Sequence, residues 1–170
     1  MIELRDNEKE YIKNKKGLLE KNNLKQFFSS IPSNCGNIAP MLIMNGFNVF
    51  KYIDNITHRM FSGSTIDTFE IPEGVEIIGK SAFENCLDLK SVVIPDTVKK
   101  IQDNAFINCP KLRKLIIPDS VVSLGKHVFD DGIKLATPKR TLKNKLQLPK
   151  NELDWYKNHL VILKNTEEEE

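Results

Sequence analysis

The chain has 170 residues, enough for one domain with terminal extensions and for a core that needs no metal or disulfide. Hydrophobic residues make up 40% and charged residues 28%, as in an ordinary globular protein, and a net charge of +2 does not imply a wholesale role on nucleic acid or membrane surfaces. No stretch approaches 18 apolar residues, and no apolar signal core is found in the opening residues MIELRDNEKEYIKNKK. We therefore expect a cytoplasmic protein with no membrane partner.

Residues 1–52 are predicted to form a helical N-terminal cap. The i, i+3, i+4, i+7 spacing of a helix with one buried face is found at Leu24, Phe27, Phe28 and Ile31. Asn37 is predicted to cap a second helix, IAPMLIMN, which Gly46 ends and which accepts Pro40 because it lies in the first turn. These helices either shield the open apolar end of the segment that follows or carry a binding surface themselves.

Residues 53–135 form a repeat. Three segments open on Ile-Pro at Ile71, Ile94 and Ile117, which are 23 residues apart, and a degenerate copy precedes them from Ile53. The recurring apolar columns are Val75/Val98/Val121, Ile78/Ile101/Leu124, Ala82/Ala105/Val128, Phe83/Phe106/Phe129 and Leu89/Leu112/Leu135. One thin repeat cannot bury so many apolar side chains, whereas stacked repeats can, so the pattern predicts a solenoid of about 3.5 coils. The phenylalanines are predicted to form an aromatic spine.

Each repeat is predicted to contain one short strand that ends at its proline, and the strands are IDTFEIP, LKSVVIP and LRKLIIP. Side-chain alternation places Leu89, Val92 and Ile94 in one register and turns Ser91 and Val93 outward. A turn follows each proline, and its first residues form the column Glu73/Asp96/Asp119. These stacked carboxylates fit either a cation site or turn capping, and their place directly after Ile-Pro favours turn capping.

The pattern C-x-x-L-x-x-V/L-x-I-P-x-x-V-x-x-I-x-x-x-A-F, from Cys86 to Phe106, resembles the BspA-like, or Treponema pallidum-type, leucine-rich repeat. The resemblance covers residues 53–135 and implies an α/β fold, a curved right-handed solenoid of short parallel strands between a helical N-terminal cap and a mixed C-terminal cap. It also implies a non-catalytic protein that binds other proteins. Members of the family are often secreted or surface-bound, and many others occur in phages and protists.

The three cysteines are expected to be free thiols, because an odd number in a reducing compartment argues against a disulfide framework. Cys86 and Cys109 share a repeat column with Gly132, which predicts small buried side chains with a weak S–H donor; a disulfide or half of a metal site is the alternative. Cys35, in the predicted loop PSNCGN, is the one plausible reactive thiol, although no catalytic base can be assigned to it.

Catalytic chemistry finds little support in the sequence. The histidines lie far apart, at His58, His127 and His159, and His127 occupies a repeat position held elsewhere by Ser81 and Asn104. The sequence shows no glycine-rich phosphate loop, no Ser/Cys-His constellation and no metal-ligand spacing. We expect no enzyme activity, no cofactor and no metal.

Residues 136–163 are predicted to form a basic loop and a C-terminal cap, NELDWYKNHLVIL, as a helix or a helix plus strand, and residues 164–170 an acidic tail. The run 134–150 contains no acidic residue, and its basic residues are Lys134, Lys139, Arg140, Lys143, Lys145 and Lys150. Such a run is a solvated loop, or it contacts an acidic partner or a nucleic-acid backbone. The candidates for that contact are Lys139, Arg140, Lys143 and Lys145.

The outward strand face is the expected partner-binding surface, and its candidate residues are Thr68, Glu70, Lys90, Ser91, Val93, Arg113, Lys114 and Ile116. Val93 and Ile116 are exposed apolar side chains in a row, and a basic rim around such a pair is typical of an interface centre. Alternatively, β-branched residues simply suit a strand, or a terminal segment covers this face. We expect a protein-interaction module, in one form a phage or mobile-element accessory protein that inhibits a host protein; the alternative is a nucleic-acid-associated protein.

Overall fold

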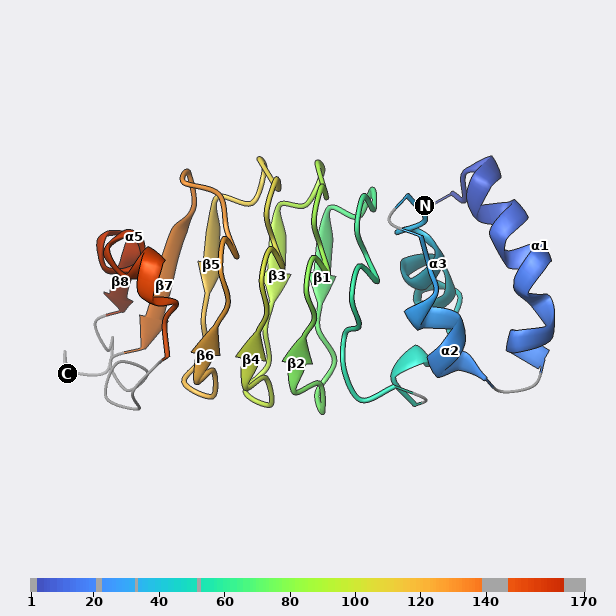
Figure 1. The fold of residues 1–170 in the computed structure, drawn as a ribbon, viewed down its shortest axis with the longest axis horizontal. Helices are drawn as coiled ribbons and strands as arrows, with labels where there is room; N and C mark the ends of the chain where they lie inside the picture. Colours follow the sequence, from blue (N-terminus) through green and yellow to red (C-terminus); the bar gives the residue numbers. More distant parts are fainter. Residues whose placement is uncertain (1–2, 21–22, 33, 52, 139–146, 164–170) are drawn as a thin grey trace, which may run out of the picture.

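The structure, a computed structural model, describes residues 3–20, 23–32, 34–51, 53–138 and 147–163. Its elements follow one another along a single axis, with helices at the N-terminal end, stacked coils in the middle, and a short helix and a last strand at the other end (Figure 1). The N-terminal elements are α1 (Asp6–Glu20), α2 (Leu24–Ser29), α3 (Ile38–Met44) and the 3₁₀ turn η1 (Val49–Lys51). The chain therefore has the mixed α/β composition that the repeat pattern predicts.

The two predicted helices of the cap are confirmed. α2 and the residues after it bury the apolar positions expected to face the core, which are Leu24, Phe27, Phe28 and Ile31. α3 carries Pro40 in its first turn and ends at Met44, two residues before Gly46, whose φ of +81° is the left-handed conformation that stops a helix. Asn37 precedes α3, but the prediction that its side chain caps this helix is wrong, because it makes no capping hydrogen bond.

The coils contribute two series of short parallel strands. One series comprises β1 (Thr68–Glu70), β3 (Ser91–Val93), β5 (Lys114–Ile116) and β7 (Lys134–Pro138). The other comprises β2 (Ile77–Ile78), β4 (Lys100–Ile101) and β6 (Ser123–Leu124). Thr68 pairs with Ser91, and Ile78 pairs with Ile101, both 23 residues on, so the predicted solenoid of parallel strands is confirmed.

The aromatic spine runs through the core of the coils. The rings of Phe83 and Phe106 stack with centroids 5.0 Å apart, and those of Phe106 and Phe129 stack at 5.7 Å. Phe61 of the degenerate first copy extends the stack, 4.8 Å from Phe83. The interplanar angles between successive rings are 7° or less, so the ring has nearly the same orientation in each coil, as the 23-residue column predicts.

A second column fixes the bend of each coil in a left-handed backbone conformation. Ser81, Asn104 and His127 have φ of 55°, 58° and 48°, although none of them is glycine. Asparagine and other short polar residues tolerate this conformation best, and His127 adopts it because it occupies the same place in the coil. The repeat position inferred for His127 is therefore correct, and its side chain is exposed.

The last coil is shorter than the 23-residue period. Lys114 pairs with Lys134, 20 residues on, and Leu135 pairs with Leu115, so the predicted column Leu89/Leu112/Leu135 is wrong at its third member. Gly132 is exposed and does not continue the buried cysteine column. The carboxylate of Asp130 accepts hydrogen bonds from the backbone N–H groups of Asn108 and Cys109, at 2.9 and 2.8 Å, and so satisfies donors that the shortened coil no longer reaches.

The C-terminal end continues the stack through η2 (Lys150–Glu152), α5 (Leu153–His159) and β8 (Leu160–Leu163). β8 pairs in parallel with β7. β7 itself extends across residue 135, where the end of the solenoid was expected. α5 followed by β8 confirms the predicted helix plus strand. Tyr156 of α5 is fully buried, and its hydroxyl donates to the carbonyl of Gly125 at 3.2 Å. The acidic tail and residues 139–146, with the basic candidates Lys139, Arg140, Lys143 and Lys145, lie outside the described residues.

Candidate protein-binding face

The outward side chains of β3 and β5 leave apolar groups exposed on the strand face. Both strands alternate exposed, buried, exposed, with Val92 and Leu115 turned into the core. Val93 is 54% exposed and Ile116 is 49% exposed, as the alternation predicts. All eight residues predicted for this face are exposed.

A groove of about 430 Å³ lies between β3 and β5 and brings five of these residues together, namely Lys90, Ser91, Val93, Lys114 and Ile116. The groove coincides with a break in the sheet. β1 pairs with β3, and β5 pairs with β7, but no ladder joins β3 to β5 among the residues that the structure describes. The side chains of Val93 and Ile116 therefore form walls of a groove that a partner can enter.

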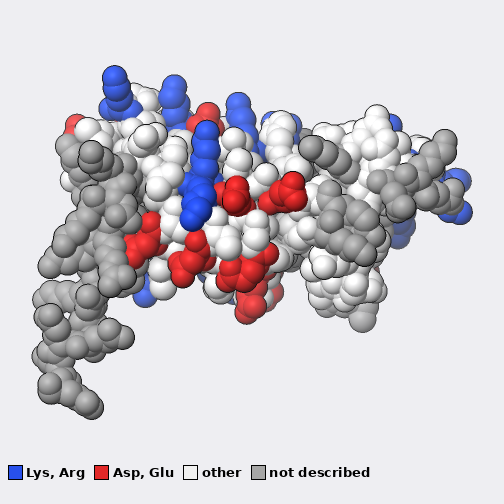
Figure 2. All heavy atoms as spheres, turned by 90° about the horizontal axis from the view of Figure 1, so that it is seen from below, with Lys and Arg blue, Asp and Glu red and all other residues white. Residues whose placement is uncertain are grey.

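The charges around this groove are basic and mostly unpaired. Lys90 Nζ lies 3.8 Å from Asp67 Oδ2, an exposed contact of little energetic weight. Lys114 and Arg113 make no ion pair with any described residue. Viewed from below, the molecule presents acidic side chains across the middle of that face, with a basic side chain among them, and further basic side chains along one edge (Figure 2). Side chains of both signs are therefore present on this face of the molecule, whose net charge is only +2.

A second groove, of about 640 Å³, lies where the N-terminal cap meets the first coil. Three of the predicted residues line it, Thr68, Glu70 and Lys90. Its other wall is α3, with Ile43 and the 62% exposed Met44, which sequence reasoning did not assign to the site. The sequence offered only one signal for this wall, a methionine at the end of a short apolar helix. That signal does not indicate which part of the chain the methionine lies against.

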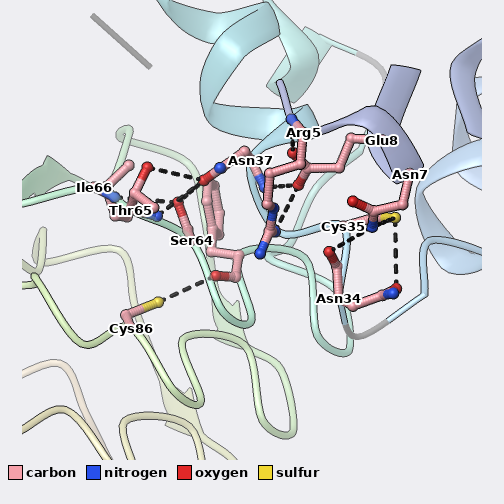
Figure 3. A network of polar contacts seen from close by, with 11 residues as sticks. Arg5, Asn7, Glu8, Asn34, Cys35, Asn37, Ser64, Thr65, Ile66 and Cys86 are labelled. Carbon is pink, nitrogen blue, oxygen red and sulfur yellow. Dashed lines mark hydrogen bonds and ion pairs between the residues drawn. The ribbon is translucent and has the colours of Figure 1, made fainter. Parts of the chain in front are cut away.

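A buried polar network joins the cap to the first coil (Figure 3). The carboxylate of Glu8, on α1, is fully buried and accepts hydrogen bonds from Arg5 Nη2 at 2.8 Å and from the backbone N–H of Asn37 at 2.9 Å. The side-chain oxygen of Asn37 accepts from Ser64 Oγ at 3.0 Å and from the backbone N–H of Thr65 at 2.9 Å. Asn37 therefore holds the first coil instead of capping α3.

Glu8 is ionised in this network. Burial alone raises the pKa of its carboxyl, but the hydrogen bonds from the side chain and backbone of Arg5 and from the backbone of Asn37 outweigh burial. The pKa of Glu8 therefore lies below its usual range. The negative charge is compensated by donors on both sides of the junction between α1 and the rest of the cap.

The cysteines are structural. Cys86 and Cys109 are buried and free, and each thiol donates to a carbonyl of the preceding coil, Phe61 or Phe83, at 3.1 Å. The predicted buried thiol column is confirmed, and contact with the Cys109 thiol together with burial raises the pKa of Cys86. Cys35, the one thiol that the sequence left as plausibly reactive, is only 2% exposed, and burial and the nearby Glu8 carboxylate raise its pKa, so the structure does not support reactivity there.

A family model described as BspA type Leucine rich repeat region (6 copies) matches residues 54–147, more than half of the chain. The chain belongs to this family. The BspA-type match agrees with the resemblance seen from Cys86 to Phe106 and extends it beyond residue 135, across the short last coil. Leucine-rich repeat families are typically non-catalytic and bind other proteins.

Several solved structures of leucine-rich proteins are similar to part of this BspA-type chain. A cell surface protein from Faecalibacterium prausnitzii is 29% identical over 45% of this chain and 21% of its own, with a TM-score of 0.42. The pneumococcal vaccine antigen PcpA is 27% identical over 53% of this chain and 24% of its own, with a TM-score of 0.48. A T. pallidum leucine-rich repeat protein is 18% identical over 55% of this chain and 61% of its own, with a TM-score of 0.44. No curated protein matches the chain.

The turn after Ile71 and Pro72 is tied to the next coil by hydrogen bonds. Gly74 adopts a φ of +94°, and its N–H donates to Thr97 Oγ1 of the next coil at 3.2 Å, while that hydroxyl donates to the carbonyl of Val75 at 2.9 Å. The turn after Pro72 is therefore bonded to the turn of the next coil. In the described part of the chain, no three His, Cys, Asp or Glu side chains are grouped so as to hold a metal ion. No helix within those residues has the length and apolar character needed to cross a membrane.

Proposed function

We propose that this chain is a non-catalytic interaction module that binds another protein through the outward face of β1, β3 and β5. The observation that carries the proposal is the groove between β3 and β5, where Val93 and Ile116 are about half exposed beside Lys114, which makes no ion pair with a described residue. An apolar centre with a charged rim is the usual anatomy of a protein interface.

The energy available at this centre is modest but sufficient for specificity. Fully burying a valine or isoleucine side chain is worth ~1.5–3 kcal/mol, so covering the exposed half of Val93 and of Ile116 contributes roughly 1 kcal/mol each. A few such central contacts dominate the affinity of most interfaces, because the surrounding residues mainly exclude water. A charge placed at either position would have to be desolvated at the contact and would therefore oppose binding.

A narrower form of the proposal is that the module is an accessory protein of a phage or mobile element, which acts in the cytoplasm by covering a surface of a host protein. Inhibition of this kind needs only binding, and the resemblance to a family with phage members supports it. Cell fractionation that finds the native protein outside the cytoplasm would contradict this form and leave the interaction module intact.

The test compares Val93→Glu/Ile116→Glu with a matched control, Leu87→Glu/Val122→Glu. All four positions carry exposed apolar side chains of the solenoid, but Leu87 and Val122 line neither groove. Each tagged variant is used for affinity capture from the native host cell, followed by mass spectrometry, after circular dichroism has confirmed the fold. We expect one protein that wild type and control retain and the strand-face variant loses.

Retention of that protein by Val93→Glu/Ile116→Glu would refute the strand-face assignment. Captured nucleic acid in place of a protein, lost when salt is raised and lost on replacing the basic residues of 139–146, would instead support the nucleic-acid alternative.

A further inference from the structure

The groove between α3 and the first coil has a chemistry of its own. One wall is apolar and comes from the cap, through Pro40, Ile43 and Met44. The opposite wall comes from β1 and carries Thr68 and Glu70. A volume of about 640 Å³ is enough for several side chains of an extended peptide segment, and it exceeds the 430 Å³ of the groove between β3 and β5.

The charged side chains that line this groove are mainly acidic. Asp67, Glu70 and Asp88 contribute carboxylates against the single ammonium of Lys90. Asp67 faces Lys90, and a hydrogen bond from Lys111 holds the pKa of Asp88 below its usual range. Glu70 makes no ion pair with a described residue. Among the described residues, the carboxylate of Glu70 is therefore left to meet a cation, in a groove that α3 also lines with apolar side chains.

The neighbouring groove has the opposite sign. Lys90 and Lys114 line it, together with Val93 and Ile116, and no acidic side chain does. A positively charged segment is attracted to the groove beside α3 and repelled from the one between β3 and β5, so charge selects which of the two it enters.

The groove is held open before any ligand arrives. Thr65, which lines it, donates its backbone N–H to the side chain of Asn37, and Asn37 precedes α3 directly. Gly36 lies so close to the carbonyl of Ser62 that any side chain there would collide with it. The cap is thus locked to the first coil on the side that forms the groove. A preformed groove spares a ligand the entropic cost of ordering it.

We infer that this groove binds a basic segment of the partner protein, with an apolar side chain against Ile43 and Met44 and a lysine or arginine side chain against Glu70. The inference rests on the proposed function and assigns the partner's chemistry at the cap end of the same face. Charge complementarity carries it: the carboxylate of Glu70, which makes no ion pair with a described residue, and the exposed apolar side chain of Met44 line one groove.

The test is a titration of the ¹⁵N-labelled full chain with two synthetic peptides, acetyl-GLKLKG-amide and its acidic twin acetyl-GLELEG-amide, followed by amide chemical shifts. The basic peptide should give saturable shifts at Ile43, Met44 and Thr68–Glu70, with little change at Val93 and Ile116, and the acidic twin should give none at the cap groove. Glu70→Lys should weaken binding of the basic peptide about tenfold or more, because it replaces attraction by repulsion.

The matched control is Glu73→Lys, which makes the same change of net charge at an exposed position that does not line the groove. Equal weakening by both substitutions, or shifts that follow the acidic turns instead of the groove, would overturn the inference as general charge attraction. Concentration-dependent self-association in sedimentation velocity, abolished by Glu70→Lys, would show that a second copy supplies the basic segment and would overturn its assignment to another protein.

Capture of the native partner separates this inference from the proposed function. Loss of the partner by Glu70→Lys and Val93→Glu/Ile116→Glu alike supports both. Loss by Val93→Glu/Ile116→Glu alone overturns the basic-segment groove and leaves the strand face. Loss by Glu70→Lys alone overturns the strand-face centre and leaves the groove.

Discussion

Replacing Phe106 by alanine removes the ring that joins the two halves of the aromatic spine. Phe106 is 1% exposed and stacks on Phe83 at 5.0 Å and on Phe129 at 5.7 Å. Truncating a buried phenylalanine costs about 3–5 kcal/mol of unfolding free energy, and each lost aromatic pair is worth ~0.5–1.5 kcal/mol. Because both pairs are lost, we expect Phe106→Ala to cost about 4–5 kcal/mol, toward the upper end of that range.

Urea and thermal denaturation, followed by circular dichroism, measure this loss. In a chain of this size 1 kcal/mol corresponds to roughly 2–4 °C, so Tm should fall by about 8–20 °C. The control is Phe47→Ala, the same substitution at a 36% exposed phenylalanine of the cap, which should cost about 1–2 kcal/mol, because only part of a full burial of ~1.5–3 kcal/mol is lost. If Phe106→Ala destabilises the protein no more than Phe47→Ala does, the spine does not stabilise the solenoid and the reasoning is refuted.

Two further predictions concern the cap and the thiols. Glu8 has a lowered pKa in the folded state, so its contribution to stability is fully present above its unfolded pKa and is lost as pH falls through the lower folded pKa. Glu8→Gln should therefore lower the free energy of unfolding by about 1–3 kcal/mol at pH 7 and make that free energy fall less steeply as the solution is acidified. The same acid dependence in the variant as in the wild type would contradict the ionised network. Cys35, Cys86 and Cys109 should react with a thiol reagent about 100-fold more slowly in native protein than in urea, and rapid labelling of any one of them at neutral pH would show that its site is open.

The sequence by itself determined the solenoid. The sequence shows a 23-residue period, a two-residue alternation within each strand and a phenylalanine at the same position of each repeat. When repeats of equal length stack, residues at the same position of each repeat form a column in the structure. The outward direction of Val93 and the burial of Cys86 follow from that periodicity alone. The end of α3 could also be predicted from the sequence, because the left-handed backbone conformation that ends the helix is a local preference of Gly46.

Only the tertiary structure decided what happens where the period fails. The 20-residue register between Lys114 and Lys134 depends on the carboxylate of Asp130 replacing backbone acceptors, which no column of the repeat encodes. Asn37 and Cys35 lie in a segment without periodicity, so their burial depends on Glu8 and the first coil, tens of residues away in the chain. The groove beside α3 has the same origin: Met44 and Glu70 come to share one space only because the cap docks on the coil, and docking is a contact between separate elements that local sequence patterns do not specify.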